Sequence, residues 1–287
     1  MASILEESGF NPGADLKIVG TNPIKHDGLD KVMGRAKFGA DAFLPGMLVG
    51  KILRSPHAHA NIKSIDTSKA EALPGVKAVI TSSDFPEKKA GTPPGDMTRN
   101  VMAREKALYD GHPVAAVAAT SEKIAKQALK LIEVDYEILP HVIDPVEAMK
   151  PDAPILHDYL RTKGMEGAED KQTNVTERMV TQLGDIDAGF EEADVIVERS
   201  FDSKPMHQGY IEPQGCIADY SEDGQIEVWC CTQAPFVYRD RLSAILDIDC
   251  NKINSIQSSD DLCPYIVCKR WSMWTFVNMI IMSKCNN

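Results

Sequence analysis

The sequence lacks a dense run of lysine or arginine, an apolar run that could cross a bilayer, and any cysteine before Cys216. Its formal net charge is −11 at pH 7, whereas nucleic-acid-binding proteins usually carry a basic stripe, so we expect no nucleic-acid partner. A membrane span needs about 20 apolar residues. The stretch WSMWTFVNMIIM is shorter and interrupted, so we expect no membrane span. The N-terminal MASILEESGF carries acids where a signal peptide carries bases, which predicts a cytoplasmic protein.

The cysteines also exclude one class of protein. All seven lie from Cys216 onward, and an odd number gathered near one end does not form a disulfide framework. Cys263 and Cys268 have no second pair of ligands to complete a zinc site, so free thiols are the favoured interpretation. A zinc or redox patch in the tail is the weaker alternative.

The 287 residues suffice for one large domain or two ordinary ones. Residues 1–25 are a polar lead-in, after which strands and a helix alternate, typical of mixed α/β packing with helices covering a sheet. The period-two and 3.6-residue patterns predict strands over 46–55, 61–66, 76–81, 112–119 and 134–140, with helices over 68–73 and 121–134. Residues 86–100, rich in proline, glycine and charge, predict a loop.

A second domain follows a weak region at 150–180, where proline and charge are frequent. Asp185 or Asp187 is expected to cap a short acidic helix. We expect a helix over 184–193, a strand over 194–201, a hairpin of 215–220 and 225–231 around SEDG, and a helix over 234–248.

Several quoted stretches, taken in order, resemble one family. They are GRAKFGADAFLPGMLVGKILRSPHAHA, DGHPVAAVAATSEKIAKQALKLIEVDYEILP, LGDIDAGFEEADVIVERSF and CTQAPFVYRDRLSAILDID. Over about residues 17–252 the chain resembles large subunits of molybdenum hydroxylases, the group of xanthine dehydrogenase, aldehyde oxidase, aerobic carbon monoxide dehydrogenase and hydroxybenzoyl-CoA reductase. The resemblance implies an α+β (mixed α/β) fold: a hammerhead α/β domain at 26–150, then the start of an incomplete molybdopterin-binding domain at 165–252.

The resemblance also gives a role to the Thr-Gln pair in CCTQAPF. In this family such a glutamine, between a strand and a helix, donates its side-chain amide to an oxo ligand of molybdenum, and Gln233 matches it. A neutral amide can do this without adding charge. The plainer alternative is a polar residue at a strand end that makes a local hydrogen bond. The activity implied is hydroxylation of a carbon centre with water-derived oxygen. The small-molecule substrate stays open among purines, aldehydes, aromatic thioesters and carbon monoxide.

Two family features are not found in this sequence. A glycine-rich segment should follow the helix at 234–248, and a general-base glutamate should come much later, yet residues 253–287 form a divergent tail without glycine. A frameshift, a gene-fragment boundary, a decayed copy and a genuine alternative C-terminus are the explanations for this tail. We therefore expect a fragment with no catalytic residue of its own, inactive alone. The rival hypothesis is a non-catalytic interaction or assembly module. Iron–sulfur clusters and FAD are expected on separate partner subunits.

Other polar residues have structural and functional interpretations. For His57 and His59 we expect packing or hydrogen bonding rather than metal binding. For His207 and Glu212, spaced suggestively for acid–base work, we instead expect Glu212 to be a buried, paired residue that sets strand geometry.

Charged residues near turns and helices have simpler roles. We expect Asp84 to be a turn residue. Arg239 and Arg241 are interpreted as solvated, with contact to an anionic cofactor tail or a partner subunit as the alternative. A solvated helix face is predicted for Glu191, Glu192 and Asp194.

Overall fold

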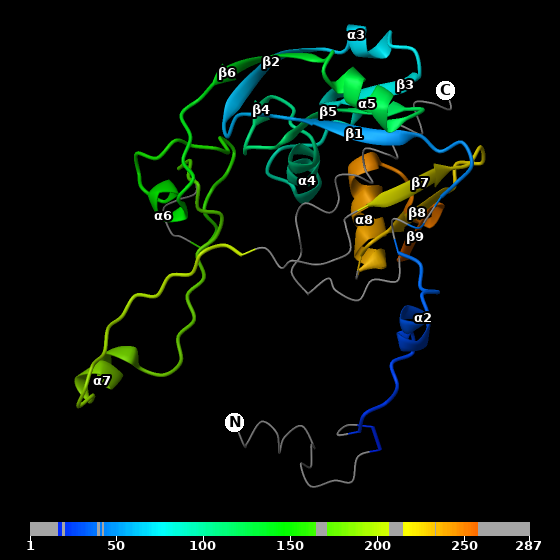
Figure 1. Cartoon of the computed structure of the whole chain (residues 1–287). Coiled ribbons are helices and arrows are strands. Elements are labelled where there is room, and N and C mark those ends of the chain that lie inside the picture. Colours follow the sequence, from blue (N-terminus) through cyan, green and yellow to red (C-terminus); the bar gives the residue numbers. More distant parts are fainter. Residues whose placement is uncertain are drawn as a thin grey trace. The chain divides into compact units, whose positions relative to one another are not determined.

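The computed structural model (Figure 1) describes residues 17–18, 21–38, 41, 43–164, 171–206, 215–232 and 234–257. The chain divides into two units, Met1–Lys37 and Phe38–Asn287. The first contains the short helix α2 (Gly28–Val32), on which Lys31 pairs with Asp27 at 2.6 Å. All other helices and strands of the described residues belong to the second unit.

The second unit is built on an antiparallel sheet whose strand order is β1-β5-β3. Its strands are β1 (Val49–Arg54), β5 (Pro113–Ala119) and β3 (Val76–Thr81). All three were predicted, and β5 is buried along its whole length. A strand buried on both faces reads as a continuous apolar run, as β5 does.

The two faces of β5 serve two different cores. Val117 and its odd-numbered neighbours pack with Ala70 of helix α3 (Ser68–Glu71) and Ala125 of helix α5 (Glu122–Leu129). The even-numbered Ala116 and Ala118 belong to the other core. Helices α3 and α5 therefore cover one face of the sheet, as predicted.

A second antiparallel sheet has the order β4-β2-β6, with β4 (Lys106–Ala107), β2 (Ala60–Asp66) and β6 (Glu133–Ile138). After β6 the helix α6 (Pro145–Ala148) starts at Asp144, whose carboxylate accepts hydrogen bonds from the backbone N–H of Val146 and Glu147. The predicted strands over 61–66 and 134–140 are thereby confirmed.

The predicted loop over 86–100 is wrong in its second half, because helix α4 covers Pro93–Val101. Thr92 caps this helix by accepting from the backbone N–H of Gly95, and prolines occupy the first helical positions, where no N–H is needed. The buried Thr98 and Val101 then hold α4 against the protein. Proline often indicates a loop, but directly after a threonine it also marks the start of a helix.

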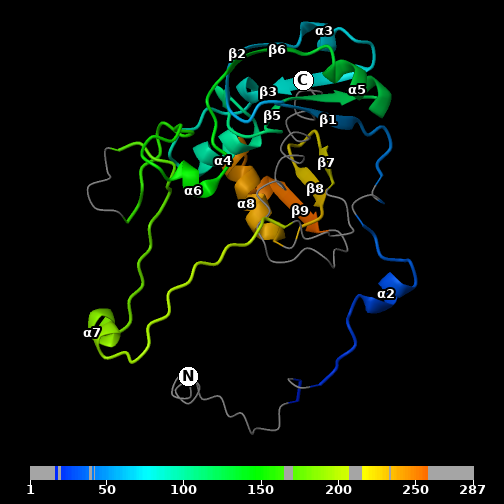
Figure 2. The ribbon, with the colours of Figure 1, turned by 60° about the vertical axis from the view of Figure 1, so that its left-hand side comes forward.

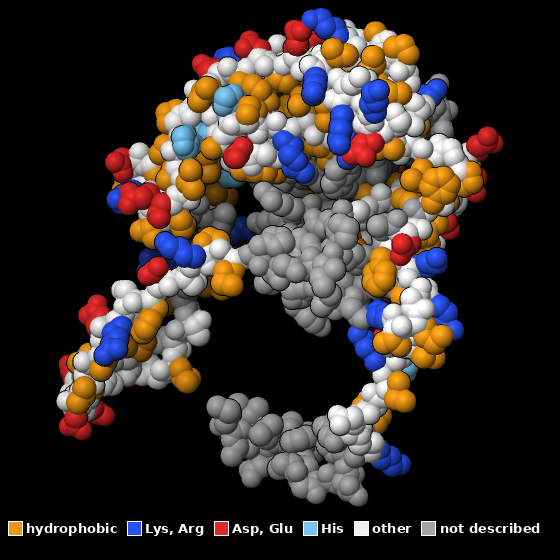
Figure 3. All heavy atoms as spheres, in the orientation of Figure 1, with side chains coloured by type: hydrophobic (Ala, Val, Ile, Leu, Met, Phe, Trp, Pro, Cys, Tyr) orange, Lys and Arg blue, Asp and Glu red, His pale blue; other side chains and the backbone are white. Residues whose placement is uncertain are grey.

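The predicted strand over 194–201 is also wrong. Helix α7 (Ile186–Glu191), capped by Asp185, forms as expected. The segment after it contains no strand in the described residues 194–201, and Val195 and Phe201 are 77% and 89% exposed. Alternating apolar residues form a strand only when a partner and a core are present. Figure 3 shows orange apolar side chains on the surface around α7.

The third sheet has the order β7-β8-β9, with β7 (Cys216–Tyr220), β8 (Ile226–Cys230) and β9 (Ile253–Gln257). The predicted hairpin is confirmed, and Gly224 allows its tight turn with a φ of 82°. Helix α8 (Pro235–Leu246) and the short 3₁₀ helix η3 (Cys250–Lys252) connect β8 to β9, which runs parallel to it. The first residue of the predicted tail, Ile253, is thus the first residue of β9.

One apolar core joins this third sheet to the first one. It contains Ile80 and Ala116 of the β1–β5–β3 sheet, Val228 of β8, and Leu242 and Ile245 of α8. Figure 2 shows α3 and α5 beside one face of the first sheet, with α8 and the third sheet beside the other. Strand β8, which leads into the Thr-Gln pair, therefore shares an apolar core with the β1–β5–β3 sheet.

Candidate functional site: the turn between β8 and α8

The candidate site is the turn that joins β8 to α8. Gln233 lies outside the described residues, so the residues on either side of it define the turn. His207, Glu212, Cys263 and Cys268 also lie outside the described residues.

Thr232 shapes the turn. Its side chain is 4% exposed, and its hydroxyl oxygen accepts a hydrogen bond from the backbone N–H of Ala234 over 3.2 Å. Helix α8 begins one residue later with Pro235, whose fixed φ suits a first helical position. The sequence thereby makes an abrupt change from strand to helix at residues 232–235.

The start of α8 is suited to a negatively charged group. Ala234 supplies no side-chain cap, and no acidic residue lies in the first turn of the helix. The N-terminus of a helix carries a partial positive charge and N–H groups without intrahelical partners. An anionic cofactor would therefore meet a favourable field here, and neutral donors beside it would add no competing charge.

The thiols of Cys230 and Cys231 beside the turn lie near polar atoms of neighbouring segments. Burial raises the pKa of the Cys230 thiol to about 12. Its sulfur lies 3.9 Å from the hydroxyl oxygen of Ser255, and the sulfur of Cys231 lies 3.7 Å from the carbonyl oxygen of Gly215. Within the described part of the chain, no three His, Cys, Asp or Glu residues form a group that could hold a metal ion.

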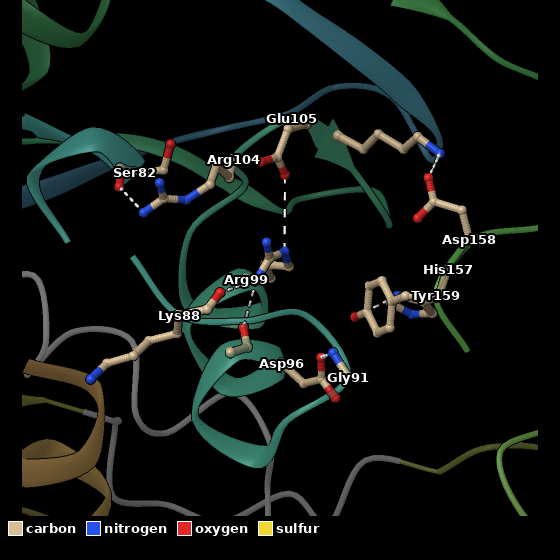
Figure 4. Close-up of polar contacts among 12 residues, drawn as sticks. Ser82, Lys88, Gly91, Asp96, Arg99, Arg104, Glu105, His157, Asp158 and Tyr159 are labelled. Carbon is tan, nitrogen blue, oxygen red and sulfur yellow. Dashed lines mark hydrogen bonds and ion pairs between the residues drawn. The ribbon is translucent and has the colours of Figure 1, made fainter. Parts of the chain in front are cut away.

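Helix α4 and the loop before it support the far end of α8. Lys88 in that loop forms an ion pair with Asp247, at which α8 ends. The carbonyl oxygen of Lys88 accepts a hydrogen bond from Arg99 over 3.0 Å, and the Arg99 guanidinium lies 4.0 Å from the carboxylate of Glu105 (Figure 4). These contacts fix the loop to α4.

A second group of contacts fixes the 3₁₀ helix η2 (Ser82–Asp84) and the chain after it. Arg104 donates to the carbonyl oxygens of Ser82 and Phe85 over 2.9 and 3.2 Å. Asp84 and Thr81 form a capping box around η2, so the predicted turn role of Asp84 is confirmed.

The segment around residue 158 packs against α4. Lys106 and Asp158 form an ion pair at 3.6 Å, and the Tyr159 hydroxyl lies 3.2 Å from Nδ1 of His157 (Figure 4). Burial, followed by hydrogen bonding to Asp96, raises the pKa of Tyr159 to about 12. Tyr159 therefore stays neutral and acts as a hydrogen-bonding contact.

The two histidines of SPHAHA have the packing and hydrogen-bonding roles that were predicted. His57 meets Tyr136 edge to face at 5.0 Å. His59 is buried, and its Nδ1 lies 2.7 Å from the carbonyl oxygen of Pro140, which assigns the proton to Nδ1.

The remaining charged candidates lie on exposed faces. Arg239 pairs with Asp240 at 2.9 Å and lies over the Phe236 ring at 5.5 Å, while Arg241 is exposed. The predicted solvated face is confirmed by the exposure of Glu191, Glu192 and Asp194. Lys88, Arg99 and Asp247 were not predicted from the sequence, because their contacts join residues far apart in the chain.

None of the helices in the described residues combines the length and the apolar character that crossing a membrane requires.

Comparison with known families gives two matches in order. Residues 33–140 match the aldehyde oxidase and xanthine dehydrogenase a/b hammerhead domain. Residues 168–259 match the molybdopterin cofactor-binding domain, so this match includes the β8–α8 turn.

Individual relatives agree with these matches. The chain is 39% identical over 229 residues to the carbon monoxide dehydrogenase large chain of Afipia carboxidovorans, covering 78% of this chain and 28% of that protein. It is 34% identical over 236 residues to a probable xanthine dehydrogenase subunit of Bacillus subtilis, covering 82% of this chain and 30% of the relative.

Among solved structures, reconstituted carbon monoxide dehydrogenase from Oligotropha carboxidovorans has a TM-score of 0.74 and 33% identity, with 92% of this chain and 34% of that chain covered. The chain thus spans about a third or less of these three proteins. It belongs to the molybdenum hydroxylase large-subunit family, of which it carries the hammerhead domain and the start of the molybdopterin cofactor-binding domain.

Proposed function

We propose that this chain is part of the molybdenum-cofactor-binding subunit of a hydroxylase that oxidises a carbon centre of a small molecule with water-derived oxygen. The observation that carries the proposal is the turn from β8 into α8, where the Thr-Gln pair lies within the match to the molybdopterin cofactor-binding domain. The molybdenum cofactor, when bound, supplies the redox chemistry, while the protein supplies orientation and proton transfer.

This chain's contribution is to hold the cofactor. Thr232 fixes the turn, and the start of α8 offers an uncapped, acid-free helix end to an anionic group. In the proposed arrangement the Gln233 amide donates a hydrogen bond to an oxo ligand of the molybdenum. A neutral donor is suited to this task because it orients the metal centre without changing its charge.

We further infer that residues 1–287 alone are catalytically inactive. The glycine-rich segment and the general-base glutamate that the resemblance implies are not recognised in this sequence. A site that is not enclosed lacks preorganised electrostatics and exclusion of water. We propose that the working assembly is cytoplasmic and that separate subunits carry its iron–sulfur clusters and FAD.

The test is to purify the chain with any co-purifying subunits from cells supplied with molybdate, and to measure molybdenum and pterin per chain. Gln233→Ala is compared with Gln225→Ala, a matched change in the exposed hairpin turn. A roughly tenfold loss of molybdenum only in Gln233→Ala supports the cofactor contact, since such outer contacts typically change affinity by about 10–100-fold. Equal molybdenum in both variants, at the level found in the unmutated protein and well above zero, would contradict the role of Gln233.

An assembly module is the second candidate. It is favoured by the apolar side chains exposed around α7, such as Leu183 (97%) and Phe201 (89%). Partner subunits recovered with a chain that contains neither molybdenum nor pterin would support this candidate. Sequencing the source DNA past codon 253 separates the explanations of the tail, because a frameshift predicts a glycine-rich, family-like reading frame downstream.

A further inference from the structure

The β7–β8 hairpin brings two cysteines directly opposite each other. Cys216 and Cys230 are register partners at the open end of the hairpin. At the turn, the backbone N–H of Ser221 donates to the carbonyl oxygen of Gln225 over 2.9 Å, so that pair is hydrogen-bonded. Hydrogen-bonded and non-hydrogen-bonded pairs alternate along an antiparallel ladder. Counting the register pairs back from the turn makes Cys216–Cys230 a non-hydrogen-bonded pair.

That position has the dimensions of a disulfide. In non-hydrogen-bonded pairs the Cα atoms are about 4.5 Å apart, and the Cβ atoms lie at the short end of about 4.5–5.5 Å. Disulfides span Cα separations of about 4.4–6.8 Å and Cβ separations of about 3.5–4.5 Å. A bond between Cys216 and Cys230 therefore needs no change of register and only a small approach of the side chains.

The thiols of Cys216 and Cys230 differ in exposure to solvent. Cys230 is 4% exposed and lies in the apolar core, whereas Cys216 is partly exposed and packs against the edge of that core. An oxidant in solution reaches Cys216 first. Cys231 follows Cys230 by one residue, so its side chain points to the opposite side, where it contacts Gly215.

We propose that Cys216 and Cys230 are a redox-sensitive pair that a peroxide converts into a cross-strand disulfide. In the first step hydrogen peroxide transfers one oxygen atom to the Cys216 sulfur, giving a sulfenic acid and water. In the second step the Cys230 sulfur attacks the Cys216 sulfur, the S–S bond forms, and the S–O bond breaks. The hydroxide that leaves takes the Cys230 proton and becomes a second water. Two thiols are oxidised and one peroxide is reduced.

The Cys216–Cys230 disulfide would change the contacts of β8 just before the turn that leads to α8. Cys230 is the last residue of β8, two positions before Thr232. On oxidation its sulfur leaves Ser255 of β9 and joins β8 to β7 instead. A small thiol reverses the change by disulfide exchange. This inference does not depend on the proposed molybdenum site, since it rests on the hairpin alone.

The test treats the full chain with dilute hydrogen peroxide, blocks remaining thiols with N-ethylmaleimide, and digests with Glu-C and trypsin. Because neither protease cleaves before proline at Pro205 or Pro213, they place Cys216 on residues 200–222, and Cys230 with Cys231 on residues 228–239. We expect a linked pair of these peptides by mass spectrometry, abolished by dithiothreitol. Fragmentation between residues 230 and 231 identifies the bonded sulfur in the unmutated protein.

Three variants complete the test. The link should persist in Cys231→Ala, disappear in Cys230→Ala, and be unaffected by Cys250→Ser, a change at an exposed thiol. Because Cys230→Ala changes a core position, circular dichroism must show that this variant is folded. The fragmentation result comes from the unmutated protein and does not depend on this variant. A bond from Cys216 to any other cysteine would overturn the proposal. So would the absence of a bond in a sample in which Cys250 is oxidised.

Discussion

Lys88, in the loop before α4, forms an ion pair with Asp247, the residue at which α8 ends in a left-handed conformation with φ of 56°. A carboxylate at a helix C-terminus is unfavourable because the helix dipole is negative there, and the lysine ammonium offsets this repulsion. The lysine side chain is 19% exposed, although the aspartate is 61% exposed. The contact therefore links the α4 region to α8 through a partly shielded charge pair.

We expect the pair to couple the two residues weakly but measurably. In a double-mutant cycle of Lys88→Ala and Asp247→Asn, the coupling in the free energy of unfolding should be about 0.5–1 kcal/mol, because asparagine tolerates the left-handed conformation and only the charge is lost. Urea unfolding at low and high salt measures it. The exposed Lys150–Glu147 pair is the control, with coupling below about 0.5 kcal/mol. Equal coupling energies in the Lys88–Asp247 and Lys150–Glu147 cycles would contradict the proposal that Lys88 and Asp247 link the α4 region to α8.

His112 should make stability depend on pH. The side chain is fully buried, and burial lowers its pKa to about 4 from an ordinary value of 6.5. Its Nδ1 accepts from the backbone N–H of Leu108 over 3.1 Å, and its Nε2 lies 2.8 Å from the carbonyl oxygen of Arg99, which fits the neutral ring. Between pH 6.5 and pH 4, His112 binds a proton in the unfolded chain but stays neutral in the folded protein. The free energy of unfolding therefore has its full value above pH 6.5 and falls as the pH is lowered toward 4.

The difference between the unfolded and folded pKa of His112 corresponds to a loss of about 3 kcal/mol in the free energy of unfolding between pH 6.5 and pH 4. Denaturant unfolding at several pH values should show the loss in the unmutated chain and a flatter profile in His112→Gln, which is also less stable at pH 7 by about 1–3 kcal/mol. His141→Gln, at an exposed histidine, should keep the original slope. An unchanged slope in His112→Gln would exclude this histidine as the source.

Two helical glycines should respond in opposite ways to alanine. A Cβ atom at Gly95 in α4 would lie 1.9 Å from the carbonyl oxygen of Lys89, whereas one at Gly189 in α7 would meet nothing within 4 Å. Gly95→Ala should therefore destabilise the protein by about 2 kcal/mol or more, since the backbone must move. Gly189→Ala should raise helix content by circular dichroism, with a gain of about 0.5–1 kcal/mol in α7. Equal destabilisation by both changes would contradict this explanation, because a Cβ atom at Gly189 meets nothing within 4 Å.

The apolar residues around α7 should contribute to association and not to the core. Val195 is 77% exposed. Val195→Thr should change the free energy of unfolding by less than about 0.5 kcal/mol, while several such changes together should reduce self-association in analytical ultracentrifugation. Val228→Thr, a fully buried control in β8, should cost about 1–3 kcal/mol. A large loss of stability in Val195→Thr would show that this segment belongs to the folded core.

The sequence by itself determined the local elements wherever a short-range pattern was sufficient. The apolar run of β5, the SEDG turn of the hairpin and the helix after Thr232 were all predicted, because turn chemistry and side-chain periodicity act between near neighbours. The family was also predicted from the sequence, since a long colinear resemblance carries more information than any one motif. The position of Gln233 between a strand and a helix follows from the same evidence.

The tertiary structure decided what depends on partners distant in the chain. Residues 194–201 alternate as a strand should, but the described part of the chain offers them no neighbouring strand or core, so they stay exposed. Conversely, Pro93 and Pro94 read as a loop until the packing of α4 showed them to be a helix start. The Lys88–Asp247 pair and the Cys216–Cys230 register are also visible only in the fold. Such pairings arise from chain closure and burial, whose energies are not encoded in any single short stretch.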